Sequence, residues 1–171
     1  HEKDFLSYKF TNISFKYNNT YKYIFKEASF SINKGDIISI NGSSGSGKTT
    51  LLDIMLGFLK IEKGIVHYNG NVDTNSYNFF RSKAAYLPQN VYLTDDTILK
   101  NVALGENDEE IDEKKVLEAL VKAKLEDFIT SIKKGVHTFI GERGTKLSGG
   151  QRQRIAIARA FYFNREVLIL D

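Results

Sequence analysis

The sequence predicts an α/β fold in which sheet-forming segments lie at both ends of the chain and a mostly helical insert lies between them. Before residue 89, aromatic and β-branched residues alternate with polar ones and are bounded by turn residues, which indicates strands. From about residue 97 to residue 161, apolar residues recur at helical spacing. The apolar run at residues 167–170 is typical of a buried strand. The length of 171 residues and a hydrophobic content of 42% fit about one globular domain.

The composition excludes several classes of function. The net charge of +3 is too weak and too dispersed to favour nucleic acid as a partner. The absence of cysteine excludes disulfides, thiol catalysis and thiolate metal sites. No apolar run approaches the roughly 18–20 residues of a membrane-spanning helix. The first residues also lack the apolar stretch of a signal peptide.

The first elements are predicted to be two antiparallel strands, at residues 8–15 and 23–32, joined by the turn-like Asn18-Asn19-Thr20. Asn33-Lys34-Gly35-Asp36 predicts another turn. Ile37-Ile38-Ser39-Ile40 then predicts a short buried strand that leads into a glycine-rich loop.

The next elements alternate between helix and strand. We expect a helix over residues 48–58 and a strand over residues 64–68, which ends at Asn69-Gly70. A further strand over residues 84–87 is stopped by Pro88, the only proline of the chain.

The helical insert is best defined around residue 116. Val116, Leu117, Leu120 and Val121 fall on one side of a predicted helix, with charged residues on the other, and Asp112 is a suitable N-cap. We therefore predict a single domain over residues 1–171. Within it, residues 1–89 and 162–171 form the β/α core, and residues 90–161 form a helical subdomain.

The glycine-rich loop is the clearest chemical motif, because it fits G-x-x-x-x-G-K-[ST] between a predicted strand and a predicted helix. Its members are Gly42, Ser43, Ser44, Gly45, Ser46, Gly47, Lys48 and Thr49. Backbone N–H groups in such a loop can surround a phosphate, and the helix start favours the same anion. Lys48 supplies a charge for the β- and γ-phosphates, Thr49 a hydroxyl for Mg²⁺, and Thr50 a further oxygen. A merely flexible Gly/Ser loop would not need the flanking strand and helix.

An acidic residue, Asp171, follows the predicted strand at residues 167–170. A carboxylate at the C-terminal end of a parallel strand can hold Mg²⁺ or its water shell. The alternative is a strand that simply leads into a turn.

A third motif combines a helix cap with two glycines. Ser148 and Gln151 form a capping box of the S-x-x-Q type. Gly149 and Gly150 leave the first N–H groups of the helix uncovered, so this is a second helix start able to bind an anion. The alternative is a helix that is merely well capped. Small residues further along the helix permit close packing: Ala156, Ala158 and Ala160.

The stretch from Lys146 to Ala160 resembles the signature of ATP-binding-cassette (ABC) ATPases, and the resemblance extends over nearly the whole chain. It implies a P-loop NTPase (RecA-like) core with an N-terminal antiparallel β subdomain and an inserted α-helical subdomain, with the C-terminal part of the core missing. Tyr17 then matches the aromatic residue that stacks on adenine, although it could be ordinary strand packing. Tyr86-Leu87-Pro88-Gln89 is similar to the Q-loop, in which Gln89 reaches Mg²⁺ and the attacking water.

The resemblance also implies a head-to-tail pair of cassettes. ATP would lie between the Lys48 loop of one chain and a contact set of the other, made of Leu147, Ser148, Gly149, Gly150 and Gln151. Lys48 and Gln89 would serve catalysis, and Thr49, Gln89 and Asp171 would hold the metal. In the family a glutamate usually follows the aspartate, and a later histidine contacts the γ-phosphate. We therefore expect binding by this chain and efficient hydrolysis by a longer protein. The alternative is a module that binds nucleotide without hydrolysing it.

Two further segments, Thr97 to Gly105 and Gly141 to Gly144, resemble those of exporter-type cassettes, although the usual glutamate before Gly141 is replaced. The implied function is ATP-driven export or flipping at the cytoplasmic side of the inner membrane. The implied partners are a fused transmembrane domain and a second cassette in a homodimer. A separate ATPase subunit of an importer is the alternative. Lipids, lipid-linked sugars, peptides and drugs are all open as substrates; of these we single out lipid-linked oligosaccharides.

Overall fold

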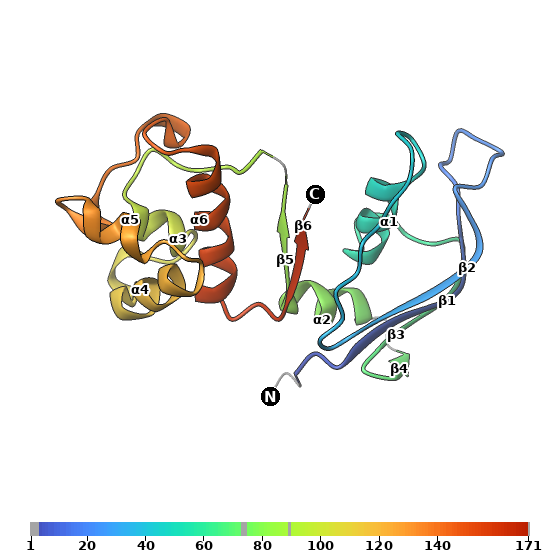
Figure 1. The fold of residues 1–171 in the computed structure, drawn as a ribbon. Coiled ribbons are helices and arrows are strands. Elements are labelled where there is room, and N and C mark those ends of the chain that lie inside the picture. The colour runs from blue at the N-terminus through green and yellow to red at the C-terminus, as the bar shows by residue number, and fades with distance from the viewer. Residues whose placement is uncertain (1–3, 73–74, 89, 171) are drawn as a thin grey trace. The chain divides into compact units, whose positions relative to one another are not determined.

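The computed structural model describes residues 4–72, 75–88 and 90–170 (Figure 1). The chain divides into two compact units, an N-terminal unit of His1–Lys83 and a C-terminal unit of Ala84–Asp171. None of the helices in the described ranges has the length and apolar character needed to cross a membrane.

The N-terminal unit is built on a four-stranded antiparallel sheet in the order β2-β1-β3-β4. The strands are β1 (Ser7–Phe15), β2 (Phe25–Asn33), β3 (Lys63–Tyr68) and β4 (Asn71–Val72). The predicted hairpin of the first two strands is confirmed, with a turn at Asn18 and Asn19. Phe10 of β1 is paired with Phe30 of β2, and their rings stack 4.6 Å apart, which fixes the register.

Two helices complete this unit, α1 (Lys48–Met55) and α2 (Ser76–Lys83). Tyr8 joins both to the sheet. Its ring stacks on Phe80 of α2 at 4.1 Å, and its hydroxyl donates a hydrogen bond of 3.0 Å to the carbonyl of Met55 at the end of α1. Burial raises the pKa of the Tyr8 hydroxyl, so this group remains a donor.

The prediction of a buried strand at Ile37–Ile40 is wrong for this structure. These residues have no strand conformation, and Ile37 and Ile38 are 102% and 51% exposed. An apolar run forms a strand only when neighbouring strands accept and donate its backbone hydrogen bonds. Within the described part of the N-terminal unit, no such neighbour pairs with residues 37–41.

The C-terminal unit begins and ends with strands, and its helices come between them. β5 (Ala84–Leu87) and β6 (Val167–Leu170) pair in parallel, with Ala84 opposite Val167 and Leu87 opposite Leu170. The α-helices are α3 (Ile98–Val102), α4 (Glu113–Lys122), α5 (Glu126–Ser131) and α6 (Gly149–Tyr162). Three single 3₁₀ turns are η1 (Asp108–Glu110), η2 (Gly135–His137) and η3 (Glu142–Gly144).

The helices share one hydrophobic core, to which α6 contributes Ile155, Ala158 and Tyr162. In α4 the buried face consists of Val116, Ala119, Leu120 and, just after the helix, Ala123. Asp112 caps α4 as predicted, because its carboxylate accepts a 3.0 Å hydrogen bond from the Lys115 N–H.

The predicted apolar face of α4 is wrong in two positions. Leu117 and Val121 are 40% and 45% exposed. One face of a helix carries residues spaced three, four or seven apart, so the neighbours directly after Val116 and Leu120 turn away from the buried face.

Strand β6 is likewise less buried than predicted. Ile169 is 8% exposed but Leu170 is 66% exposed. A parallel strand is normally covered on both faces and both edges, whereas within the described part of its unit β6 pairs with β5 alone.

Candidate functional site

The glycine loop leads directly into α1. Gly47 is the N-cap of this helix and has a φ of 96°, a conformation that favours glycine. A Cβ atom on Gly47 would lie 2.7 Å from the Cγ2 atom of Ile24, so the hairpin between β1 and β2 leaves no room for a side chain. No side chain caps the helix start. The first N–H groups of α1 are therefore left open to an anion.

Lys48 covers the same loop with its own side chain. Its ammonium group donates to the carbonyl oxygens of Gly42 at 2.8 Å and Ser43 at 2.9 Å. Thr49 is exposed, and the residues from Gly42 to Ser46 are exposed as well. The loop thus offers backbone donors and a positive charge at an accessible surface of the N-terminal unit.

Tyr17 lies in the same unit and reaches the helix that follows the loop. Its hydroxyl is 3.0 Å from the Thr50 hydroxyl. The Tyr17 ring is 43% exposed, whereas Thr50 is 8% exposed. The predicted base-stacking residue and the helix of the phosphate loop are therefore in direct contact.

The second predicted anion site begins α6. The capping box is confirmed: the Gln151 N–H donates to the Ser148 hydroxyl at 3.2 Å, and the Ser148 N–H donates to the Gln151 side chain at 2.8 Å. Ser148, Gly149 and Gly150 are exposed. A Cβ atom on Gly150 would meet nothing within 4 Å, so nothing in the chain's own packing requires glycine there.

Leu147 differs from its neighbours in this motif. Its side chain is 6% exposed and belongs to the hydrophobic core of the C-terminal unit. Its carbonyl accepts a 2.7 Å hydrogen bond from the Arg152 guanidinium. Leu147 therefore anchors the start of α6, and the exposed residues Ser148 to Gly150 form its accessible surface. The close packing predicted for Ala156, Ala158 and Ala160 is confirmed, since each is at most 7% exposed.

Gln89 and Asp171 lie outside the described residues. The strands that precede them are described, and the pairing of Leu87 with Leu170 brings the C-terminal ends of β5 and β6 to the same edge of the sheet. Within the described ranges, no cluster of three or more acidic, histidine or cysteine residues could hold a metal ion.

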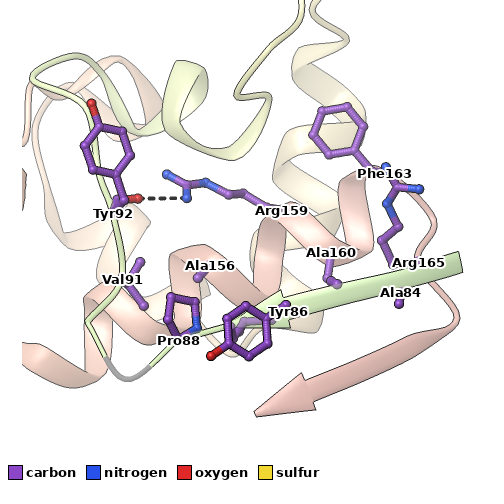
Figure 2. A pocket seen from close by; sticks show the side chains of 12 residues that line it. Ala84, Tyr86, Pro88, Val91, Tyr92, Ala156, Arg159, Ala160, Phe163 and Arg165 are labelled. Carbon is purple, nitrogen blue, oxygen red and sulfur yellow. Dashed lines mark hydrogen bonds between the residues drawn. The ribbon is translucent and has the colours of Figure 1, made fainter. Parts of the chain in front are cut away.

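A cavity of about 240 Å³ lies between β5 and the second half of α6 (Figure 2). Arg159 lines it and extends from α6 to the carbonyl oxygen of Tyr92, to which it donates at 2.8 Å. The same guanidinium donates to the carbonyl and side-chain oxygens of Asn101, a residue that is fully buried. Burial lowers the pKa of Arg159 to about 10, which still leaves it charged at neutral pH.

Nothing in the sequence pattern predicts the network between Arg159 and Asn101. The available signals are an asparagine next to apolar residues in a predicted helix and an arginine between two alanines. The Asn101 side chain also donates to the carbonyls of Thr94 at 3.1 Å and Thr97 at 2.9 Å. The network therefore fixes the segment that precedes α3 to the side of α6.

The first exporter-like segment is joined to the residues that directly precede the second one. Thr97 forms an antiparallel bridge with Phe139, the Ile98 N–H donates to the Thr138 carbonyl, and the Ile140 N–H donates to the carbonyl of Asp96. The start of α3 and the approach to the signature motif are thus one structural element of the C-terminal unit.

A glycine loop that opens into a helix N-terminus, with a lysine folded over it, defines a P-loop nucleotide-binding domain. The capped start of α6, with its two glycines, matches the signature motif of the ABC class of these domains. The family model described as ABC transporter matches residues 25–171, and the chain belongs to this family of ATP-binding proteins.

Two bacterial relatives of this chain are named as a flippase and as a putative multidrug export protein. The chain is 40% identical over 164 residues to the ATP-dependent lipid A-core flippase of Coxiella burnetii, a match that covers 95% of this chain and 28% of the flippase. It is 37% identical over 165 residues to the putative multidrug export ATP-binding/permease protein YgaD of Bacillus subtilis, again covering 95% and 28%.

A solved structure has the same fold. A bacterial Atm1-family ABC exporter with ATP bound superposes with a TM-score of 0.82 and 32% sequence identity, over 98% of this chain and 29% of that one. The predicted α/β fold with a P-loop core is thereby confirmed. The chain spans less than a third of the length of each of these relatives.

Proposed function

We propose that this chain is the ATP-binding and ATP-hydrolysing cassette of an exporter- or flippase-type ABC transporter. The observation that carries the proposal is the open start of α1, where Gly47 exposes backbone donors and Lys48 covers the loop. Family membership supports ATP as the nucleotide. The names of the relatives, which include flippase and multidrug export proteins, support export over import.

Different residues of the loop bind different parts of the nucleotide. The N–H groups of Gly42 to Thr50 surround the phosphates, and the Lys48 ammonium exchanges its contacts with two carbonyls for the β- and γ-phosphate oxygens. Tyr17 stacks on the adenine ring. Phosphoryl transfer to water then requires positioning and charge stabilisation more than covalent chemistry, and Gln89 is the proposed partner of the attacking water.

The proposed metal is Mg²⁺, held by Thr49, Gln89 and Asp171. The donors are a hydroxyl, an amide and a carboxylate, and these oxygen ligands suit a hard divalent cation. Thr49 fits this role because its hydroxyl is exposed at the start of α1 and is engaged by no other described residue. The ion would neutralise charge between the β- and γ-phosphates.

We propose further that two cassettes bind ATP between them. Each would offer Ser148, Gly149, Gly150 and Gln151, held in place by Leu147, to the nucleotide of its partner. The exposed start of α6 supports this role, because Ser148, Gly149 and Gly150 are accessible and the N–H groups of a helix start can donate to an anion. ATP would favour the closed pair through contacts made only in that state.

The remaining parts of the proposal concern the longer protein. A transmembrane domain fused to the cassette would place the cassette at the cytoplasmic side of the inner membrane, as the names ATP-binding/permease and flippase of the relatives suggest. Lipids or lipid-linked sugars are the favoured substrates, and nucleic acid is not a proposed partner. We propose residues 1–89 and 162–171 as the core of the cassette and residues 90–161 as its helical subdomain.

The pairing can be tested with two complementary variants. Gly150→Asp places a carboxylate where the partner's phosphate would approach, and it should leave the fold intact because a Cβ atom there meets nothing. Lys48→Ala weakens ATP binding at the glycine loop. Neither variant alone should associate in the presence of ATP and Mg²⁺. An equimolar mixture should, because Lys48 of one chain and Gly150 of the other restore one complete site.

Sedimentation velocity with and without ATP measures this association. Gly150→Ala serves as the control, because it adds a methyl group without charge and should associate as the wild type does. If the wild type associates with ATP but the mixture does not, the head-to-tail arrangement is wrong. ATP hydrolysis measured for the full-length transporter separates the cassette from a module that only binds nucleotide.

A further inference from the structure

We propose that the hydrogen bond between Tyr17 and Thr50 positions the adenine-stacking ring relative to the phosphate loop, so that the Tyr17 hydroxyl is itself a determinant of ATP affinity. This inference rests on the proposed function. It assigns to the hydroxyl a role separate from that of the ring, and it gives Thr50 a partner within its own chain.

Contacts of its backbone, ring and hydroxyl fix the position of Tyr17. At its base, the carbonyl of Tyr17 accepts a 3.0 Å hydrogen bond from the Thr20 N–H, which closes the turn after β1. Along its side, Phe15 meets the ring edge to face at 5.1 Å. At its tip, the hydroxyl lies 3.0 Å from the Thr50 hydroxyl. A ring that is 43% exposed is thus kept in one orientation by its contacts.

Thr50 is a suitable anchor because it belongs to the first turn of α1, two residues after Lys48. It is 8% exposed, and the N–H of the next residue, Leu51, donates to the Gly47 carbonyl at 2.8 Å. A threonine inside a helix commonly turns its hydroxyl back to a carbonyl of the preceding turn. In the described structure the hydroxyl of Thr50 is instead bonded to Tyr17.

The donor count leaves Thr50 able to bind a phosphate as well. A hydroxyl has one proton to donate and two lone pairs to accept with. If Tyr17 donates its proton to Thr50, the Thr50 proton is free to point at a phosphate oxygen. The bond therefore links the base-binding and phosphate-binding parts of the site without using up the donor that the phosphates need.

A merely structural role makes a different prediction. If Tyr17 only packed against the hairpin, removing its hydroxyl would change stability and leave ATP binding unaltered. If it only stacked on adenine, phenylalanine would serve as well. An orienting hydrogen bond instead predicts that affinity falls only for ligands that carry a base. The expected loss is that of one neutral hydrogen bond, about three- to tenfold in affinity.

The test compares ATP with tripolyphosphate, which has the phosphates but no base, by isothermal titration calorimetry with Mg²⁺ present. Tyr17→Phe should weaken ATP binding about three- to tenfold and change tripolyphosphate binding by less than twofold. Tyr21→Phe is the matched control, because Tyr21 lies in the same connection and is 100% exposed. It should bind both ligands as the wild type does.

A second arm isolates the bond itself. In a Thr50→Val background the hydroxyl partner is already gone, so adding Tyr17→Phe should have no further effect on ATP affinity. Any of three results would overturn the inference. Tyr17→Phe could leave ATP affinity unchanged, it could lower the affinity for both ligands equally, or it could lower ATP affinity just as much in the Thr50→Val background. Failure of the wild type to bind ATP would instead contradict the proposed function.

Discussion

Replacing Lys48 by alanine is expected to weaken ATP binding by about ten- to a hundredfold. The ammonium group lies over the glycine loop, where it donates to the carbonyl oxygens of Gly42 and Ser43. Charge-assisted hydrogen bonds to phosphate contribute about 1.5–3 kcal/mol, which corresponds to this range of affinities. Calorimetric titration of ATP into the variant measures the loss.

The matched control is Lys34→Ala, because Lys34 is an exposed lysine of the same unit in the turn after β2. It removes the same net charge without touching the loop, so it should change the affinity by less than twofold. An equal loss in both variants would mean that overall charge, rather than the position of Lys48, attracts the nucleotide. Unchanged affinity in Lys48→Ala would contradict the proposed site.

Replacing Arg159 by methionine is expected to lower the free energy of unfolding of the C-terminal unit by about 2–4 kcal/mol. Methionine keeps the apolar length of the side chain but removes the donors that serve the carbonyls of Tyr92 and Asn101. Asn101 is completely buried, so the loss of the guanidinium leaves its oxygens without a donor that they have inside the core. Urea unfolding followed by circular dichroism measures the change.

Arg154→Met is the control for this prediction, because Arg154 lies on the same helix with an exposed side chain and a single 3.3 Å hydrogen bond to the Lys124 carbonyl. Its effect should stay within about 0.5 kcal/mol, as is usual for surface substitutions. Similar losses in the two variants would show that helix α6 responds to any loss of an arginine, and that the buried network has no special weight.

Local patterns in the sequence predicted local structure well. The capping box of Ser148 and Gln151 and the N-cap at Asp112 are confirmed, because each depends on residues three positions apart. The hairpin before residue 33 is also confirmed, because its two strands follow each other directly in the sequence. The same is true of the glycine loop, whose helix begins at Lys48 as the motif requires. Its helix ends at Met55, three residues earlier than predicted.

Predictions that depended on distant partners succeeded less often. The apolar side chains of residues 37–40 predict a buried strand, whereas the structure shows these residues exposed and unpaired within the described part of their unit. The contacts of Tyr17 with Thr50 and of Arg159 with Asn101 join residues far apart in the chain. No periodicity marks such pairs, because the fold rather than the local sequence brings them together.

The pairing of β5 with β6 has a consequence for how the polypeptide acquires its structure during synthesis. The core of the helices between them also depends on α6, which packs against α3 and α4 and ends at Tyr162, shortly before β6 begins at Val167. The two strands come from opposite ends of the unit, so β5 leaves the ribosome long before its partner exists. Closure of the parallel pair and the packing of α6 are therefore both expected as late steps, because each requires the last residues of the unit.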